Sequence, residues 1–131
     1  MRETVAFKAR LTNDVTTNRK EVLVNNFVML NIGGGYNNQT GVFTAPVSGL
    51  YIFMAKVSNA EEEKTAKVDV VLDNNPIAFA VASGTYDSCT CHAVVKVVAG
   101  QKVWLRTFSE SSSFCGKWGT AFCGVLIKPE L

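Results

Sequence analysis

The sequence predicts an all-β protein, a sandwich or barrel of about ten short antiparallel strands. Three observations lead to this prediction. Almost no stretch has the spacing of apolar residues that is typical of an amphipathic helix. Apolar segments and turn signals alternate roughly every 8 to 12 residues. The 131 residues, 47% of them hydrophobic, are enough for one domain with a sizeable core.

The first quarter of the chain predicts three strands. Residues 4–11 alternate apolar with smaller or polar side chains, which predicts a strand with one buried face. Residues 12–20 are polar and predict a turn. Residues 22–30 are apolar but interrupted by two asparagines, which predicts two short strands with a kink. The glycines at 33–35 predict a turn, because glycine tolerates positive φ.

The middle of the chain predicts four further strands. Residues 42–45 form a strand that Pro46 closes, because proline cannot donate to a ladder. Residues 49–57 form the next strand, and a charged loop follows. Residues 66–72 alternate apolar with polar side chains, and residues 77–82 form a second strand after a turn. The two predict a β-hairpin with one solvent-exposed face.

The last third predicts three strands, two polar loops and one tight turn. The loops are rich in serine and glycine, which favour turns over strands. In chain order these are a loop at 83–88, a strand at 91–98, a turn at 99–101, a strand at 102–108, a loop at 109–119 and a strand at 120–127.

Three of the strands lack the usual alternation. Residues 50–57, 93–98 and 121–127 are apolar on both faces, except for Lys56, Lys96 and a cysteine thiol. If the three lie side by side in one sheet, a monomer exposes a large apolar patch, and such patches mark interfaces. We therefore expect a homo-oligomer packed through that sheet. The alternative is that loops or a short N-terminal strand cover it.

The charge balance argues against two classes of partner. Thirteen basic and eleven acidic residues give a formal charge of +2, which supplies no strong field for nucleic acid or an anionic membrane. No apolar run reaches the length of a membrane-spanning helix, so membrane insertion is not expected. The N-terminus has no apolar signal core, which fits either a cytosolic protein or a chain whose targeting segment has been removed.

Four cysteines leave two alternatives open. Cys89, Cys91, Cys115 and Cys123 could form two disulfides, with three possible pairings, or remain four buried free thiols. Cys89 and Cys91 are poor partners for each other because they share one face of a strand. A zinc site is less favoured, because the spacing is CxC and His92 points away from its cysteine neighbours.

Catalysis has little support in the sequence. No GxSxG, P-loop or HExxH motif occurs, and the three glycines at 33–35 do not continue as a dinucleotide fingerprint. His92 follows Asp87 and Ser88 closely, but this spacing is no evidence of triad geometry. We therefore expect a protein that is not an enzyme and that has no cofactor.

Five blocks of sequence resemble one family. They are VAFKA at 5–9, Asn-Ile-Gly at 31–33 with its tyrosine, TGVFTAP at 40–46, Ala-Gly-Gln at 99–101, and AFCGVL at 121–126. In order and spacing, residues 5–129 resemble the globular head domain of the complement C1q family, within the C1q and tumour necrosis factor superfamily. The matching scaffold positions are Asn31, Gly33, Tyr36, Gly41, Phe43, Pro46, Gly49, Tyr51, Phe53, Gly100, Phe122 and Gly124.

The resemblance implies a ten-stranded antiparallel jelly-roll sandwich over residues 1–131 that assembles as a secreted homotrimer. In that topology the three doubly apolar strands face the threefold axis. No Gly-x-y repeat occurs, so a head without a collagen stalk is expected. Asn25 departs from the family, which often has phenylalanine there. Glu110 stands alone in the loop before the last strand, so no metal site is expected and calcium binding is at best weak.

The family resemblance favours a binding module over a catalyst. It implies lectin-like recognition of microbial or cell-surface glycans in innate immunity, with a cerebellin-like or cytokine-like ligand for a receptor protein as the alternative. Loops at 83–88 and 109–118 offer groups that suit sugars. The candidate ligand-binding residues are Tyr86, Asp87, Glu110, Lys117 and Trp118, although Trp118 could instead pack under its loop. Asn38 begins an N-glycosylation sequon, which matters only in a secreted protein.

Overall fold

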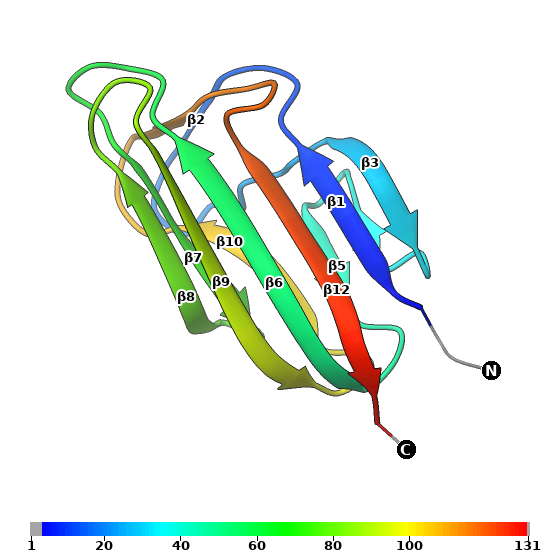
Figure 1. Cartoon of the computed structure of the whole chain (residues 1–131). Helices are drawn as coiled ribbons and strands as arrows, with labels where there is room; N and C mark the ends of the chain where they lie inside the picture. The colour runs from blue at the N-terminus through cyan, green and yellow to red at the C-terminus, as the bar shows by residue number, and fades with distance from the viewer. Residues whose placement is uncertain (1–3, 131) are drawn as a thin grey trace.

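The computed structural model describes residues 4–130, and within this range it contains twelve strands and no helix (Figure 1). Ten strands form two five-stranded sheets, and the other two form a short ribbon. The strands are β1 (Ala6–Arg10), β2 (Val15–Thr17), β3 (Phe27–Ile32), β4 (Tyr36–Asn37), β5 (Val42–Thr44), β6 (Gly49–Ser58), β7 (Ala66–Leu72), β8 (Asn75–Ala82), β9 (Ser88–Val97), β10 (Lys102–Thr107), β11 (Ser112–Phe114) and β12 (Ala121–Pro129).

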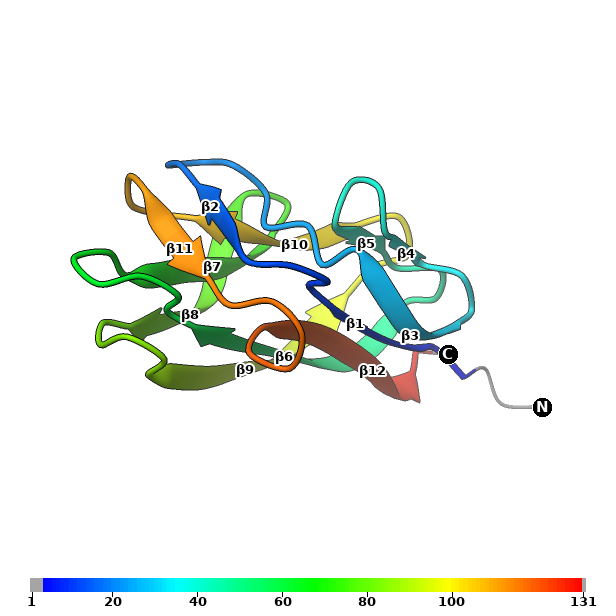
Figure 2. The ribbon, with the colours of Figure 1, turned by 90° about the horizontal axis from the view of Figure 1, so that it is seen from above.

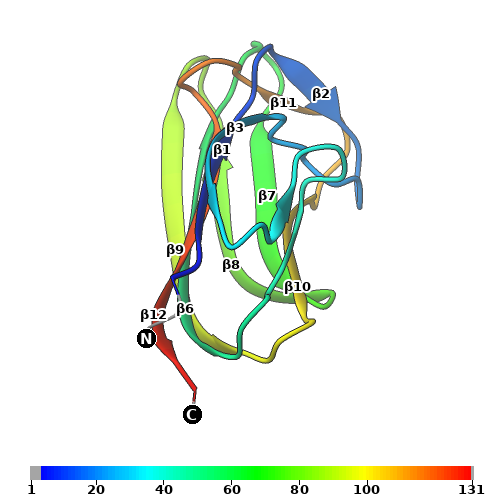
Figure 3. The same cartoon turned by 90° about the vertical axis from the view of Figure 1, so that its right-hand side faces the viewer.

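The two large sheets pack face to face. Sheet I has the order β3-β1-β12-β6-β9, and sheet II has the order β4-β5-β10-β7-β8. Every pairing is antiparallel, and the chain repeatedly crosses from one sheet to the other. Viewed from the side, β9, β6 and β12 form one layer, with β7 and β10 in the other (Figure 3). This alternation between two antiparallel layers is the jelly-roll arrangement that the family resemblance implied.

The core between the sheets is built around the Phe7 ring. It stacks on the rings of Tyr36 and Phe43, with centroids 4.9 and 4.7 Å away, and meets the edge of Phe122 at 4.9 Å. Phe53 lies beside this group, and all five rings are buried. Four of these aromatics are predicted scaffold positions, so the family pattern marks the residues that join the two sheets.

Two scaffold positions have clear local reasons. The amide of Asn31 donates to the Tyr36 carbonyl at 2.9 Å and accepts from the Tyr36 amide nitrogen at 3.2 Å, which closes the glycine turn between β3 and β4. A Cβ on Gly124 would lie 2.6 Å from the Phe7 ring and 2.7 Å from the Phe53 ring. Only glycine therefore fits under these two rings.

The structure confirms the strand at 66–72 and corrects the predictions for three other segments. In place of two short strands at 22–30 it has one, β3, with Val22 in an isolated bridge, and the glycine turn is followed by the short strand β4. The segments 12–20 and 109–119, predicted as loops, contain β2 and β11, which pair with each other (Figure 2). Both strands are rich in serine and threonine, so they lack the apolar signal of a strand. Polar contacts support the ribbon: the hydroxyls of Thr17 and Thr107 lie 2.5 Å apart.

Candidate functional site

The three doubly apolar strands are neighbours in sheet I, as the family resemblance implied, and their order is β12-β6-β9. Val125, Ile52 and Val94 lie opposite one another across these strands, and Val94 is 59% exposed. The row continues through β1 to β3, where Ile32 is also exposed. The outward side of sheet I, here called the apolar face, also carries the polar side chains of Lys8 and His92, in the row of Leu30 and Met54. Its apolar residues are Phe27, Leu30, Ile32, Ile52, Met54, Val94 and Val125.

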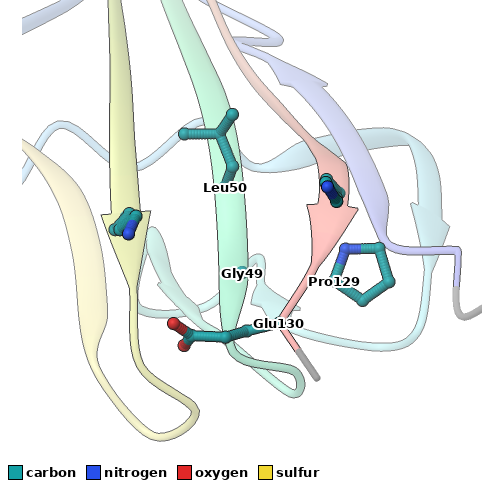
Figure 4. A pocket seen from close by; sticks show the side chains of 6 residues that line it. Gly49, Leu50, Pro129 and Glu130 are labelled. Carbon is teal, nitrogen blue, oxygen red and sulfur yellow. The ribbon is translucent and has the colours of Figure 1, made fainter.

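Charged residues border the apolar face at both ends of the strands. At one end Lys128, Leu50 and Lys96 lie in register, and these residues border a pocket of about 340 Å³. Figure 4 shows the Glu130 side chain crossing the end of β6 toward β9. At the other end, Arg10 and Lys56 flank Ala121 in register. An apolar centre with a polar rim is the anatomy of a protein–protein interface.

Arg10 holds Trp118 at the edge of the apolar face. The guanidinium carbon lies 4.2 Å from the centroid of the Phe27 ring and 4.6 Å from that of Trp118. Lys56 Nζ also donates to the Trp118 carbonyl at 3.3 Å. The indole remains 66% exposed, so it does not pack beneath its loop. Arg10 covers one face of the indole ring, so less of the ring surface is available to stack on a sugar.

Tyr86 and Asp87 lie at the tip of the loop between β8 and β9. Tyr86 is 75% exposed and has a φ of 63°, so its loop holds it in the left-handed region. The Asp87 carboxylate accepts a hydrogen bond from the Gly84 amide at 3.1 Å. Asp87 therefore shapes the turn that presents the tyrosine ring.

Asn59 joins this loop to two others, and sequence reasoning missed it. Its backbone amide donates to the Asp87 carbonyl at 3.1 Å and its carbonyl accepts from the Tyr86 amide at 2.7 Å. Its buried side-chain amide donates to the carbonyls of Glu61, Lys64 and Ser83, and accepts from the Ser113 hydroxyl. The partners are mostly backbone carbonyls, which leave no signal in a sequence.

Glu110 and Lys117 lie in two other connections. Both are exposed; Glu110 lies between β10 and β11, and Lys117 between β11 and β12 with a φ of 55°. The five candidate residues thus come from three connections at one end of the sandwich (Figure 1). Within residues 4–130, no hydrogen bond or ion pair joins their side chains to one another. The structure therefore does not assemble them into one built pocket.

All four cysteines are free thiols in the structure. Cys89 and Cys91 pack against the core, while Cys123 lies on the outward side of sheet I, opposite Lys8 and Met54. Burial raises the pKa of the Cys91 and Cys123 thiols, and nearby Lys8 partly offsets this for Cys123. His92 pairs with Met54, on the face opposite its cysteine neighbours. Across the described residues, no three groups of metal-binding type gather at one point.

Solved structures define the class of fold. The globular domain of zebrafish complement 1qA protein superposes with a TM-score of 0.78 at 19% identity, covering 98% of this chain and all of that one. Eiger TNF from S. frugiperda gives a TM-score of 0.82 at 12% identity, covering 99% and 96%. Murine APRIL gives 0.75 at 15% identity, covering 95% and 100%. The fold is thus the jelly roll shared by C1q and tumour necrosis factor proteins.

Comparison of sequences gives a more specific result than comparison of folds. The C1q domain family model matches residues 6–127, so this chain belongs to the C1q domain family. Complement C1q tumor necrosis factor-related protein 3 from human and from mouse are each 33% identical over 106 residues, or 78% of this chain. The chain spans 42% of the length of each of these relatives.

No helix within residues 4–130 is long and apolar enough to cross a membrane.

Proposed function

We propose that this chain is a secreted, non-catalytic recognition module that works as a homotrimer. The observation that carries the proposal is the apolar face of sheet I, where one apolar row, Ile32–Ala6–Val125–Ile52–Val94, runs without interruption across all five strands. Apolar area of this kind is unfavourable in water, and closed symmetry lets identical faces cover one another. Membership of the C1q domain family supports the same assembly.

The ligand surface in this proposal is the loop end of each subunit, with glycans of microbial or host cells as ligands. Tyr86 supports this part: its ring is exposed, and Asn59 braces the backbone on which it sits. A fixed aromatic face can stack on the apolar face of a pyranose, while polar groups on the neighbouring loops take its hydroxyls. Three copies on one trimer would add avidity.

The second candidate function is that of a signalling ligand for a cell-surface receptor protein. The relationship to complement C1q tumor necrosis factor-related protein 3 favours it. The same exposed tyrosine would then act as an aromatic anchor in a protein interface.

A glycan array with the purified chain separates the two functions. We expect saturable binding that Tyr86→Ala abolishes, while Thr85→Ala in the same loop leaves it within twofold. A silent array, together with saturable binding to a protein on cells, would instead support the signalling function. Unchanged glycan binding by Tyr86→Ala would remove this loop as the ligand surface.

A further inference from the structure

The outward side of sheet II carries a groove that the proposed function does not use. Lys102, Trp104 and Arg106 alternate along β10, so all three side chains project from the same face. Lys20 and Val22 border them from the segment after β2, where Val22 forms a bridge to Arg106. With Val42 and Asn74, these residues line a volume of about 570 Å³.

Positive charge dominates this groove. Its lining contains three cationic side chains and no carboxylate. Arg106 is fixed in place: one nitrogen lies 3.4 Å from the Asp69 carboxylate and another donates to the Asn74 carbonyl at 3.5 Å. Within the described residues, neither Lys20 nor Lys102 forms an ion pair, and both are exposed. These two ammonium groups are free to meet an anion.

The acidic residues beside the groove are already engaged. Asp69 pairs with Arg106. Asp73 accepts hydrogen bonds from the Lys102 backbone nitrogen at 2.9 Å and from the Gln101 amide at 3.2 Å. Its carboxylate therefore stabilises the turn after β7. Hydrogen bonds to neutral amides leave the Asp73 carboxylate charged, so the cationic character is confined to the lining of the groove, where Lys20 and Lys102 lie with the Trp104 indole.

We infer that this groove binds an acidic saccharide, one whose pyranose rings carry sulfate or carboxylate groups. Trp104 offers an aromatic face for a sugar ring, with Val22 and Val42 as apolar walls. Lys20 and Lys102 meet the anionic substituents through charge-assisted hydrogen bonds. A nucleic acid fits less well, because the chain has a net charge of only +2 and the cations are confined to one short groove.

The groove stays open in the proposed trimer. It lies on sheet II, whereas the apolar face lies on sheet I, on the other side of the sandwich (Figure 3). It is built from β5, β10, the segment after β2 and the β7–β8 turn, and not from the loops that carry Tyr86 and Trp118. The inference is therefore independent of the proposed glycan site in the loops, and an experiment can disprove either one without affecting the other.

Titration of the intact chain with defined oligosaccharides tests the inference. The probes are a heparin-derived octasaccharide, an oligogalacturonate of similar length, neutral dextran and a single-stranded oligonucleotide. We expect one or both acidic saccharides to bind saturably and to shift the indole N–H resonance of Trp104 but not that of Trp118. The two acidic probes distinguish sulfate from carboxylate recognition, and dextran should not bind.

Variants locate the site. We expect the double change Lys20→Gln and Lys102→Gln to weaken binding about tenfold, because two charge-assisted contacts are lost. Lys67→Gln is the matched control, since Lys67 lies on β7 of the same sheet but outside the groove. It should change the affinity less than twofold. Equal weakening by the control, tighter binding of the oligonucleotide, or no binding of either acidic saccharide would each overturn the inference.

Discussion

The guanidinium carbon of Arg10 lies 4.6 Å from the centroid of the Trp118 ring, so the β11–β12 connection is tied to β1 across the edge of sheet I. The centroid of the Phe27 ring lies 4.2 Å from the same carbon. A tryptophan that looks like a sugar platform in the sequence is thus part of a stack with a cation. This relationship gives Trp118 a structural role that can be measured.

Trp118→Ala should lower the free energy of unfolding by about 1 kcal/mol, because a cation–π contact at a partly exposed site contributes about that much. Chemical denaturation measures it. Trp118→Phe is the control and should retain most of the stability, since it keeps an aromatic face. Glycan binding that falls sharply in Trp118→Ala while stability is unchanged would show that the indole serves a ligand instead.

Tyr36→Phe should lower the free energy of unfolding by about 1–3 kcal/mol at neutral pH. The Tyr36 hydroxyl donates at 2.7 Å to the backbone carbonyl of buried Asn25, and the change leaves that carbonyl without its partner. Denaturant titration of both proteins gives the difference. Equal stabilities would mean that water replaces the hydroxyl.

The buried Tyr36 hydroxyl also predicts that the free energy of unfolding changes at alkaline pH. Burial raises the pKa of Tyr36 above its ordinary value of 10.0. Above pH 10 the unfolded chain therefore loses the phenolic proton while the folded chain keeps it, so this stabilisation declines as pH rises. The stability gap between wild type and Tyr36→Phe should narrow between pH 9 and pH 11. A constant gap over that range would contradict the prediction.

Asn25→Leu should raise the free energy of unfolding by about 1–3 kcal/mol. Asn25 is fully buried, and neither its amide nitrogen nor its amide oxygen has a hydrogen-bond partner within residues 4–130. Leucine is close to it in size and removes both unpaired groups. Thermal unfolding provides the readout, with Asn31→Leu as a control that should destabilise because both of its amide groups are bonded. A loss of stability in Asn25→Leu would indicate a buried water bonded to the amide.

Val125→Glu should convert the proposed trimer into a monomer of 14.2 kDa, because it places a charge at the centre of the apolar face. Light scattering at micromolar concentration distinguishes this from a particle of three times that mass. Val81→Glu is the control: Val81 is also partly exposed, but it lies on sheet II and its change should leave the proposed trimer intact. A wild-type protein that is already monomeric would exclude the proposed assembly.

The fold could be predicted because its main signals are local. Strand alternation, the Pro46 stop and the doubly apolar strands are all visible in the sequence, whereas the adjacency of β12, β6 and β9 came from the family resemblance. The polar ribbon of β2 and β11 could not be predicted, because serine and threonine strands depend on distant partners such as Thr107. Asn25 was recognised as a departure from the family, but its lack of partners appears only in the folded chain.

The candidate sites were harder to predict, because they depend on segments that are distant in sequence. Tyr86 and Trp118 were both chosen as aromatic loop residues, yet one is free at a loop tip and the other stacks on Arg10. In the groove, the spacing of Lys102, Trp104 and Arg106 on one strand is visible in the sequence. The contribution of Lys20 is not, because it follows from the bridge between Val22 and Arg106.

The direction of the strands has a practical consequence. β1 begins and β12 finishes at the end of the sandwich away from the β8–β9 connection that holds Tyr86 (Figure 1). A support or fusion partner attached beyond either of these strands would therefore leave that connection facing outward. Sensor surfaces that immobilise this chain through a terminal tag should present the tyrosine ring to the solution, whereas random coupling through lysines would block the groove on sheet II.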